Sequence, residues 1–255
     1  MKIIEGKEIV APRIVYYAVP GFGKTTFASK FPNPILVRTE DGGRNIAVKK
    51  TKALETYLDF KDAIEWLMQE PHEFKTVVID TLDQLELLIT KDVCAQEGKT
   101  DLGEIGFGRG EKKSAAFLSQ VLGQLDVLNK ERGMIVLLLA HSTVSEVKDP
   151  INDPYSRFRI NINEKYCLPE VERWADCILF GNYKIRTKEH KAGTKKMIRP
   201  VGDFDTRVIY TEGRPSFLAK NRYGLPKEIE LAGTVEEVDG DVANLLNMIR
   251  ENITK

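Results

Sequence analysis

A short run near the N-terminus constrains the fold of this chain more than any other feature: Ala18-Val19-Pro20-Gly21-Phe22-Gly23-Lys24-Thr25-Thr26. An apolar segment (Ile14–Tyr17) precedes it, and Phe27, Ala28 and Phe31 follow at helical spacing. A strand, a glycine-rich loop, Lys-Thr and a helix, in this order, make a phosphate-binding loop, or P-loop. The alternative is a chance Gly-Lys-Thr in a surface turn, which requires neither the strand nor the helix.

The backbone of such a loop determines its chemistry. Successive N–H groups surround the β-phosphate of a nucleotide, and the helix N-terminus adds a partial positive charge. We expect the Lys24 ammonium to reach the β- and γ-phosphates and the Thr25 hydroxyl to bind Mg²⁺. Ala18 stands where such loops usually begin with glycine, and alanine is tolerated there if its φ is negative. The residues expected to bind the nucleotide are Pro20, Gly21, Phe22, Gly23, Lys24, Thr25 and Thr26.

Composition and charge exclude several classes of protein. The chain has 255 residues, a hydrophobic fraction of 42% and zero formal net charge, so any polyanion site must be a local patch. Its three cysteines lack metal-ligand spacing. The N-terminus lacks the apolar segment of a signal peptide, and no apolar run could span a bilayer. We therefore expect a cytoplasmic protein with reduced thiols and no membrane partner.

Strand and helix patterns alternate through the first half of the chain. Candidate strands are Arg13–Tyr17, Pro34–Arg38, Thr76–Asp80 and Met134–Ala140, and three of them are nearly all apolar, as strands buried on both faces should be. Apolar residues at helical spacing predict helices around Phe60–Leu67 and Leu118–Leu128, and a further helix from Leu82 to about Glu97. This alternation predicts an α/β fold with a mostly parallel sheet and helices on both faces.

The pattern changes in the later part of the chain. Ala175–Tyr183 predicts a buried strand, Lys184–Arg199 a hairpin, Arg207–Thr211 and Ser216–Ala219 further strands, and the residues from Asp241 a final helix. Two segments, Glu97–Gly110 and Ser145–Leu168, are expected to be irregular. We therefore expect a core over residues 1–232, with a basic hairpin at about 183–200 and antiparallel strands on its C-terminal side. An acidic segment and a helix should follow over residues 233–255.

Polar residues at the ends of three predicted strands are candidates for catalysis. Asp80 closes an apolar strand, the Walker B pattern, and is expected to hold Mg²⁺, although it could instead cap the next helix. Glu40 is the candidate for orienting and activating water, with Asp41 beside it, although both could lie in a solvated turn. His141 could contact the γ-phosphate and report hydrolysis to the segment behind it, or could be a packing or capping residue.

These segments, in this order, resemble the RecA/Rad51-like ATPase core, and most closely the phage-encoded RecA-like proteins of single-strand annealing recombination. The likeness covers about residues 12–225 and is carried by the P-loop, Val37–Gly42, Val77–Leu82 and Leu138–His141. A further segment, Phe217–Gly224, resembles the Lys-x-Arg-x-Gly element that RecA-like ring helicases present to a neighbouring subunit's nucleotide. The resemblance implies that Lys220 and Arg222 act in trans; the alternative is that they only decorate an edge strand.

Two segments combine the features of a surface for single-stranded DNA. One is the basic hairpin, in which Lys184, Arg186, Lys188, Lys195 and Lys196 could follow a phosphate backbone, although solvated basic hairpins are common. The other is Arg157-Phe158-Arg159, where an aromatic ring between arginines suits stacking on unpaired bases. The glycine-rich Gly106–Gly110 is a third candidate, or a flexible lead into a helix.

The sequence therefore predicts an ATP-binding, DNA-dependent ATPase that uses Mg²⁺ and hydrolyses ATP at subunit interfaces. Its expected partners are single-stranded DNA, further copies of itself in a ring or filament, and a single-stranded DNA-binding protein. A hexameric helicase-like motor, a P-loop kinase of a small substrate, and a module that uses ATP only for assembly remain alternatives. ATP is favoured over GTP by the resemblance and by the lack of a guanine-reading Asn/Thr-Lys-x-Asp segment.

Overall fold

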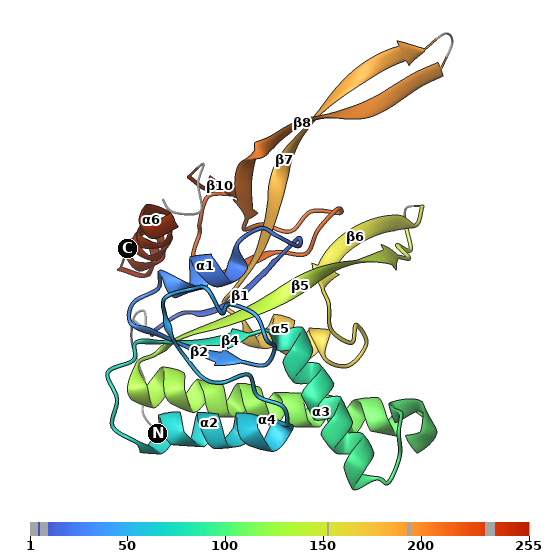
Figure 1. The fold of residues 1–255 in the computed structure, drawn as a ribbon. Helices are drawn as coiled ribbons and strands as arrows, with labels where there is room; N and C mark the ends of the chain where they lie inside the picture. Colours follow the sequence, from blue (N-terminus) through green and yellow to red (C-terminus); the bar gives the residue numbers. More distant parts are fainter. Residues whose placement is uncertain (1–4, 6–9, 152, 193–194, 233–237, 255) are drawn as a thin grey trace.

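A mixed β-sheet runs through the centre of the molecule, and helices cover both of its faces (Figure 1). The computed structural model describes residues 5, 10–151, 153–192, 195–232 and 238–254; the side chains of residues 185–205, 253 and 254 are outside that description. The strand order is β10-β8-β7-β1-β5-β4-β2-β3, with β6 paired to β5 and β9 to β7.

The parallel part of the sheet contains the predicted buried strands. It consists of β1 (Arg13–Ala18), β2 (Pro34–Arg38), β3 (Lys49–Lys50), β4 (Thr76–Asp80), β5 (Ile135–Val147) and β7 (Cys177–Ala192). Strand β1 pairs with both β5 and β7, so it lies in the middle of this layer. The bounds predicted for β2 and β4 are confirmed to the residue. All these strands point the same way, so their carboxyl ends meet at one edge of the sheet.

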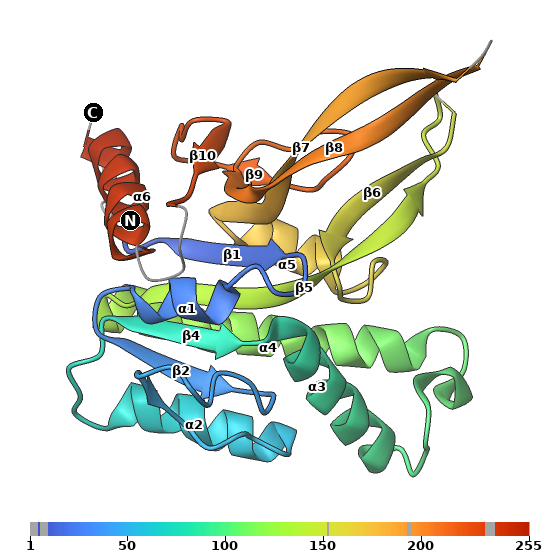
Figure 2. The same cartoon turned by 45° about the horizontal axis from the view of Figure 1, so that its top comes forward.

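The helices form two unequal layers (Figure 2). On one face lie α2 (Tyr57–Gln69), α3 (Leu82–Gln96), α4 (Arg109–Arg132) and α5 (Leu168–Trp174), while α1 (Lys24–Ser29) and α6 (Val238–Thr254) lie on the other. Strand β1 shows why the sheet separates two cores. Val15 and Tyr17 point into the larger core, whereas Ile14 and Tyr16 point into the smaller one, because side chains of a strand alternate between faces.

The segment Ser145–Leu168, which the sequence predicts to be irregular, contains an antiparallel hairpin instead. Strand β5 leaves the parallel sheet after His141 and continues to Val147, paired with β6 (Tyr155–Ile160) from Ser142↔Ile160 to Val147↔Tyr155. The exposed part of β5 alternates between half-buried and exposed residues and so lacks a continuous apolar run. The two prolines Pro150 and Pro154 lie between the strands and are typical of a loop, so the sequence does not reveal the hairpin.

Other parts of the later chain also differ from expectation. Glu97–Gly110 holds a 3₁₀ turn (Leu102–Ile105) and the first residues of α4. No strand covers Ser216–Ala219; Phe217 makes isolated bridges there, and β9 (Lys220–Asn221) follows. The final strands are β8 (Lys195–Tyr210) and β10 (Glu228–Glu230). Within the described residues, none of the helices is long and apolar enough to cross a membrane.

The predicted hairpin is confirmed and is longer than expected. Strands β7 and β8 have 16 residues each and pair in antiparallel fashion, with an irregularity between Tyr183 and Ile185. Their distal half projects beyond the helical layers (Figure 1). Helix α6 packs beside α1, on the face of the sheet opposite α2–α5. Its residues Val242, Leu245 and Ile249 share a core with Phe27 and Ala28 of α1.

Candidate functional site

The loop between β1 and α1 has the backbone of a P-loop. Gly21 and Gly23 have φ values of +74° and +94°, in the left-handed region that residues with a Cβ rarely adopt. Gly23 is the N-cap of α1, and no side chain caps the N–H groups of its first turn. Those groups are therefore available to an external acceptor, as the sequence predicts.

A glycine on the neighbouring strand supports this loop from behind. Phe22 is buried and packs edge-on against Tyr183, with ring centroids 5.5 Å apart. A Cβ on Gly181 would lie 2.7 Å from the Phe22 ring and 2.9 Å from the Cβ of Ala18. Gly181 is thus required by the close approach of Phe22 and Ala18, and sequence reasoning missed it because the approach joins strands far apart in the chain. Since the Phe22 ring lies in the core, only its backbone can contact a nucleotide.

Thr25 and Asp80 meet where the P-loop helix passes the end of β4. The Thr25 hydroxyl donates a hydrogen bond to Asp80 Oδ2 at 3.1 Å. The other carboxylate oxygen, Oδ1, is buried and has no hydrogen-bond partner in the described structure. Burial raises the pKa of Asp80, and the Thr25 hydrogen bond and the Lys24 charge partly oppose this effect. A hydroxyl and an unpaired carboxylate oxygen are hard oxygen ligands, and they fit Mg²⁺.

Lys24 is a buried cation at the centre of this site. Its ammonium donates no hydrogen bond to any residue that the structure describes. Burial lowers the pKa of Lys24, while the charges of Asp83, Asp80 and Glu40 act in the opposite direction. A bound phosphate would supply both the missing acceptor and further negative charge.

Glu40 lies beside Lys24 because its loop is tethered to the end of β4. The N–H of Thr39 donates to Asp80 O at 2.9 Å, and the Thr39 hydroxyl donates to Thr81 O at 2.7 Å. Glu40 is half-buried, and burial raises its pKa, which the charge of His141 partly offsets. Asp41, in contrast, accepts hydrogen bonds from Arg38 and Arg44, each at 2.8 Å, and so is already paired.

The loop after Glu40 folds over the Thr25–Asp80 contact. A Cβ on Gly43, whose φ is +65°, would lie 3.1 Å from the Thr25 methyl group and 3.9 Å from Asp80 Oδ2. Lys50 of β3 holds the loop by donating to the carbonyls of Gly43, Arg44 and Ile46 at 2.8, 2.9 and 3.0 Å. The sequence offers Gly42-Gly43 only as a turn signal, so this close approach could not be predicted from it.

His141 ends the part of β5 that lies beside β1, in register with Ala18. Its Nδ1 lies 2.8 Å from Asp83 Oδ2, and its backbone N–H donates to Asp83 Oδ1 at 2.9 Å. Asp83 comes from the first turn of α3, and nothing in the sequence links it to His141. The structure thus gathers Lys24, Thr25, Glu40, Asp80 and His141 at one edge and adds Asp83.

Lys220 and Arg222 lie at the opposite edge, because β9 pairs with the first residues of β7. The Lys220 ammonium donates to the carbonyls of Glu172 and Ala175, at 2.5 and 2.6 Å, at the end of α5. Arg222 is half-exposed and pairs with Asp176 at 3.2 Å. Neither residue approaches the P-loop of its own chain, so their predicted role requires a neighbouring copy.

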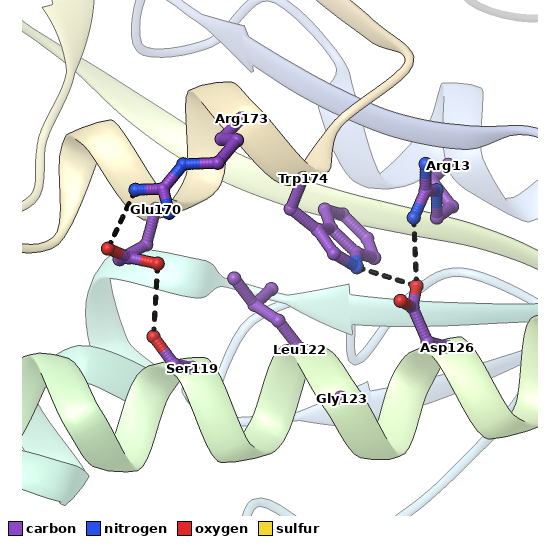
Figure 3. A pocket seen from close by; sticks show the side chains of 8 residues that line it. All are labelled: Arg13, Ser119, Leu122, Gly123, Asp126, Glu170, Arg173 and Trp174. Carbon is purple, nitrogen blue, oxygen red and sulfur yellow. Dashed lines mark hydrogen bonds and ion pairs between the residues drawn. The ribbon is translucent and has the colours of Figure 1, made fainter.

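A cavity of about 340 Å³ opens near this second edge, between α4, α5 and β1 (Figure 3). Its polar groups contact one another: Asp126 accepts from Arg13 and Trp174, at 3.0 and 2.8 Å, and Glu170 accepts from Ser119 and Arg173, at 3.3 and 2.9 Å. The cavity therefore offers few open donors or acceptors to a ligand, and its lining includes none of the candidate site residues that the sequence singles out.

Most of the predicted DNA-contacting side chains that the structure describes already contact other parts of the protein, and the rest of the set lies outside the described side chains. Phe158 packs against Phe180 at 5.3 Å between ring centroids, so its ring contributes to the core rather than being open for base stacking. Arg159 donates to Ser145 Oγ at 3.0 Å and to two backbone carbonyls at 2.8 Å. Arg157 is half-buried on β6, and Lys184 pairs with Glu230. Arg186, Lys188, Lys195 and Lys196 lie on β7 and β8, and their side chains are outside the described structure.

The tip before α4 is the third candidate. Gly106, Phe107 and Gly108 have φ values of +73°, +53° and +69°, and the Phe107 side chain is fully exposed. Arg109 begins α4 directly after this turn. The segment is an ordered turn into a helix, and its predicted contact with DNA stays a prediction.

Comparison with known proteins agrees with this geometry. The profile of a family described as AAA domain matches residues 11–223, from the start of β1 to just beyond β9. The chain belongs to this family. The match spans the P-loop, Asp80 and His141, so the chain is a P-loop ATPase by family as well as by motif.

A solved structure shows the same fold. The crystal structure of the RadB recombinase matches with a TM-score of 0.50 at 14% sequence identity, and the alignment covers 89% of this chain and 90% of that one. The predicted RecA-like α/β core is therefore confirmed as a fold. No curated protein matches the sequence.

Proposed function

We propose that this protein binds Mg²⁺–ATP, hydrolyses it and couples hydrolysis to single-stranded DNA in homologous recombination. The observation that carries the ATPase part is the hydrogen bond from Thr25 to Asp80, with the second Asp80 oxygen buried and unpaired beside an open P-loop. Thr25 and Asp80 would hold Mg²⁺, which would neutralise phosphate charge and withdraw electrons from the γ-phosphoryl group.

Within this proposal, the protein's own residues divide the chemistry. The P-loop amides and Lys24 orient the triphosphate, and the Lys24 ammonium gains the acceptor that it lacks in the free protein. Glu40 orients the attacking water and accepts its proton, a role to which its raised pKa is suited because the carboxylate is then a stronger base. His141 contacts the γ-phosphoryl oxygens from the end of β5.

Lys220 and Arg222 complete the site of a neighbouring copy in this scheme. They lie at the edge of the sheet opposite the P-loop, so a head-to-tail arrangement would bring Arg222 of one copy to the nucleotide of the next. Such an arrangement does not close after two copies, which favours a ring or a filament. Hydrolysis would then depend on assembly.

The DNA part of the proposal rests on the projecting hairpin and on the fold. Strands β7 and β8 carry Lys184, Arg186, Lys188, Lys195 and Lys196 on a ribbon that extends away from the core (Figure 1). The match to a structure titled as a recombinase is consistent with a recombination role, as is the resemblance to phage-encoded annealing proteins. In that role the protein would act in the cytoplasm, in company with a single-stranded DNA-binding protein.

The test is ATP turnover with and without DNA. We expect ADP release to rise at least tenfold on addition of single-stranded DNA and to rise less with duplex DNA. Lys24→Ala should lower turnover by about 30-fold or more in both conditions, since it removes a charge-assisted contact to phosphate, worth on the order of 2 kcal/mol. Lys30→Ala is the matched control, because Lys30 is the C-cap residue of the same helix and, among the described residues, its side chain pairs with Asp239.

Two outcomes would redirect the proposal. If the protein hydrolyses ATP at a rate that DNA does not change, the proposed dependence on DNA is wrong and the ATPase activity stands. ADP release that requires a small-molecule acceptor would identify a P-loop kinase instead.

A further inference from the structure

One carboxylate at the nucleotide edge has no role in the scheme above. Asp83 lies in the first turn of α3, three positions after Asp80, and is buried with a relative exposure of 8%. Both of its oxygens accept hydrogen bonds from the same residue, His141: Oδ1 from the backbone N–H at 2.9 Å, and Oδ2 from Nδ1 at 2.8 Å. The aspartate therefore fixes the backbone position and the ring orientation of His141 together.

The groups around the imidazole come from four elements. Asp83 on α3 binds Nδ1, while the charges of Lys24 on α1, Glu40 after β2 and Asp80 on β4 also act on the ring. With Nδ1 occupied, Nε2 is the ring atom left for a ligand. The ring is about a third exposed, so Nε2 remains accessible.

We propose that Asp83 is the positioning residue for His141: it accepts Nδ1–H and favours the imidazolium, whose second proton, on Nε2, is donated to the γ-phosphoryl group of a bound nucleoside triphosphate. The inference rests on the proposed ATPase function for its consequence, but the Asp83–His141 pairing itself is a property of the ligand-free protein. The second proton is required because a neutral ring that donates Nδ1–H has only a lone pair on Nε2. The adjacent carboxylate and the charge of a bound phosphate both favour the doubly protonated ring.

The alternative is that Asp83 only begins the helix. Helix α3 has no side-chain hydrogen bond from its N-cap residue Thr81, so an acidic residue in the first turn could serve the helix dipole alone. Asp59, in the first turn of α2, has that purely structural role: its carboxylate accepts from the N–H of Thr56 at 2.9 Å. Asp59 therefore provides a matched control for Asp83.

The first arm of the experiment uses nucleotide-free protein. The chain has three histidines, His72, His141 and His190, so ¹⁵N ring spectra are simple and His141→Gln assigns the signal. The Asp83 carboxylate raises the pKa of His141, and Asp83→Asn should lower that pKa and change the Nδ1 shift. Asp59→Asn should leave both unchanged. An unchanged His141 signal in Asp83→Asn overturns the proposal.

The second arm uses Mg²⁺ and a non-hydrolysable ATP analogue. In the wild-type protein, the analogue should shift the Nε2 resonance of His141 and leave Nδ1 nearly unmoved. A shift at Nδ1 alone would overturn the assignment of the two nitrogens. If the analogue does not bind at all, the proposed function fails while the first arm still decides the pairing.

The third arm measures turnover. Asp83→Asn should lower kcat about 10–100-fold, the usual cost of losing a group that orients a functional histidine, with little change in analogue affinity. In a His141→Gln background, the same substitution should have no further effect on kcat, because its action passes through the ring. Additive losses would overturn the proposal, and this comparison remains valid if Asp83→Asn is less stable.

Discussion

The two edges of the central sheet use charged residues in opposite ways. At the carboxyl edge of the parallel strands, Lys24 lacks a hydrogen-bond acceptor in the described structure, and Asp80 Oδ1 and Thr81 Oγ1 are buried without partners. At the other edge, Arg13 donates through Nε and Nη2 to Asp176 and through Nη1 to Asp126. One edge leaves polar groups unsatisfied, and the other pairs them.

This difference separates a binding site from a structural network. Buried polar atoms without partners reduce the stability of the free protein, and those of Asp80 and Thr81 lie beside the P-loop, where the ligand proposed above would supply partners. The Arg13 network needs no ligand. Arg222 stands between the two cases, because it pairs with Asp176 and yet remains half-exposed.

The largest effect is expected from removing Arg222. This substitution tests whether Arg222 takes part in hydrolysis or belongs only to the paired network at its edge. Arg222→Ala should lower turnover by about 10³-fold or more, the range of an arginine finger, while ATP affinity stays the same. Turnover should partly return when Arg222→Ala is mixed with Lys24→Ala, since some interfaces then combine an intact P-loop with an intact arginine.

Arg214→Ala is the control for this experiment, because Arg214 is a similarly exposed arginine that pairs with Glu228. If turnover of the mixture does not exceed that of either variant alone, Arg222 does not act on the nucleotide of a neighbouring copy.

Removal of Arg13 probes the paired edge. Arg13→Ala leaves Asp126 and Asp176 without their common cation in a mostly buried setting, so the free energy of unfolding should fall by about 3 kcal/mol. Denaturant unfolding measures this loss. ATP affinity of the folded protein should remain within twofold of wild type, and a large loss of affinity would show that the two edges are not separable.

A smaller effect of opposite sign is expected at the nucleotide edge. Burial raises the pKa of Asp80, so the folded protein binds more protons than the unfolded chain between the ordinary and the raised value. Ionisation of Asp80 therefore reduces stability as the pH rises through that window. Asp80→Asn should stabilise the Mg²⁺-free protein at pH 7 by about 1 kcal/mol and should remove Mg²⁺-dependent nucleotide binding.

The pH dependence supplies the control for this comparison. Burial acts to raise the pKa of Asp176, but the hydrogen bonds and charge of Arg13 outweigh it and lower that pKa. The contribution of ionised Asp176 to stability is therefore present above the ordinary aspartate pKa and is lost as the pH falls through the folded value. Asp176→Asn should reduce the loss of unfolding free energy that occurs as the pH falls below the ordinary aspartate pKa. Asp80→Asn should instead raise the free energy of unfolding near pH 7. The same change in both variants would contradict the assignment of opposite roles.

The parts of the fold that could be predicted are those with local signals. Strands β2 and β4 are continuous apolar runs that end in charged residues, and their bounds are confirmed. Asp80 and Glu40 follow such runs, which explains how their position at one edge could be inferred from the order of elements. The β5–β6 hairpin has weaker alternation because one of its sides faces solvent, and it was missed.

The contacts that sequence reasoning could not supply are long-range. Asp83 and His141 lie 58 positions apart, and their pairing depends on how α3 begins beside the end of β5. Arg13 and Asp176 are 163 positions apart. A charged residue near an apolar run looks the same in sequence whether it binds a ligand, a helix end or another side chain, so its partner must come from the three-dimensional arrangement.

The contact between Ala18 and Gly181 has a consequence for how such loops vary. The two residues are paired across adjacent strands, and the space between them holds one methyl group. The alanine at the first position of the P-loop is therefore accommodated by a glycine on the adjacent strand. In this chain the two positions share one volume, so a side chain larger than hydrogen at residue 181 would require a smaller one at residue 18.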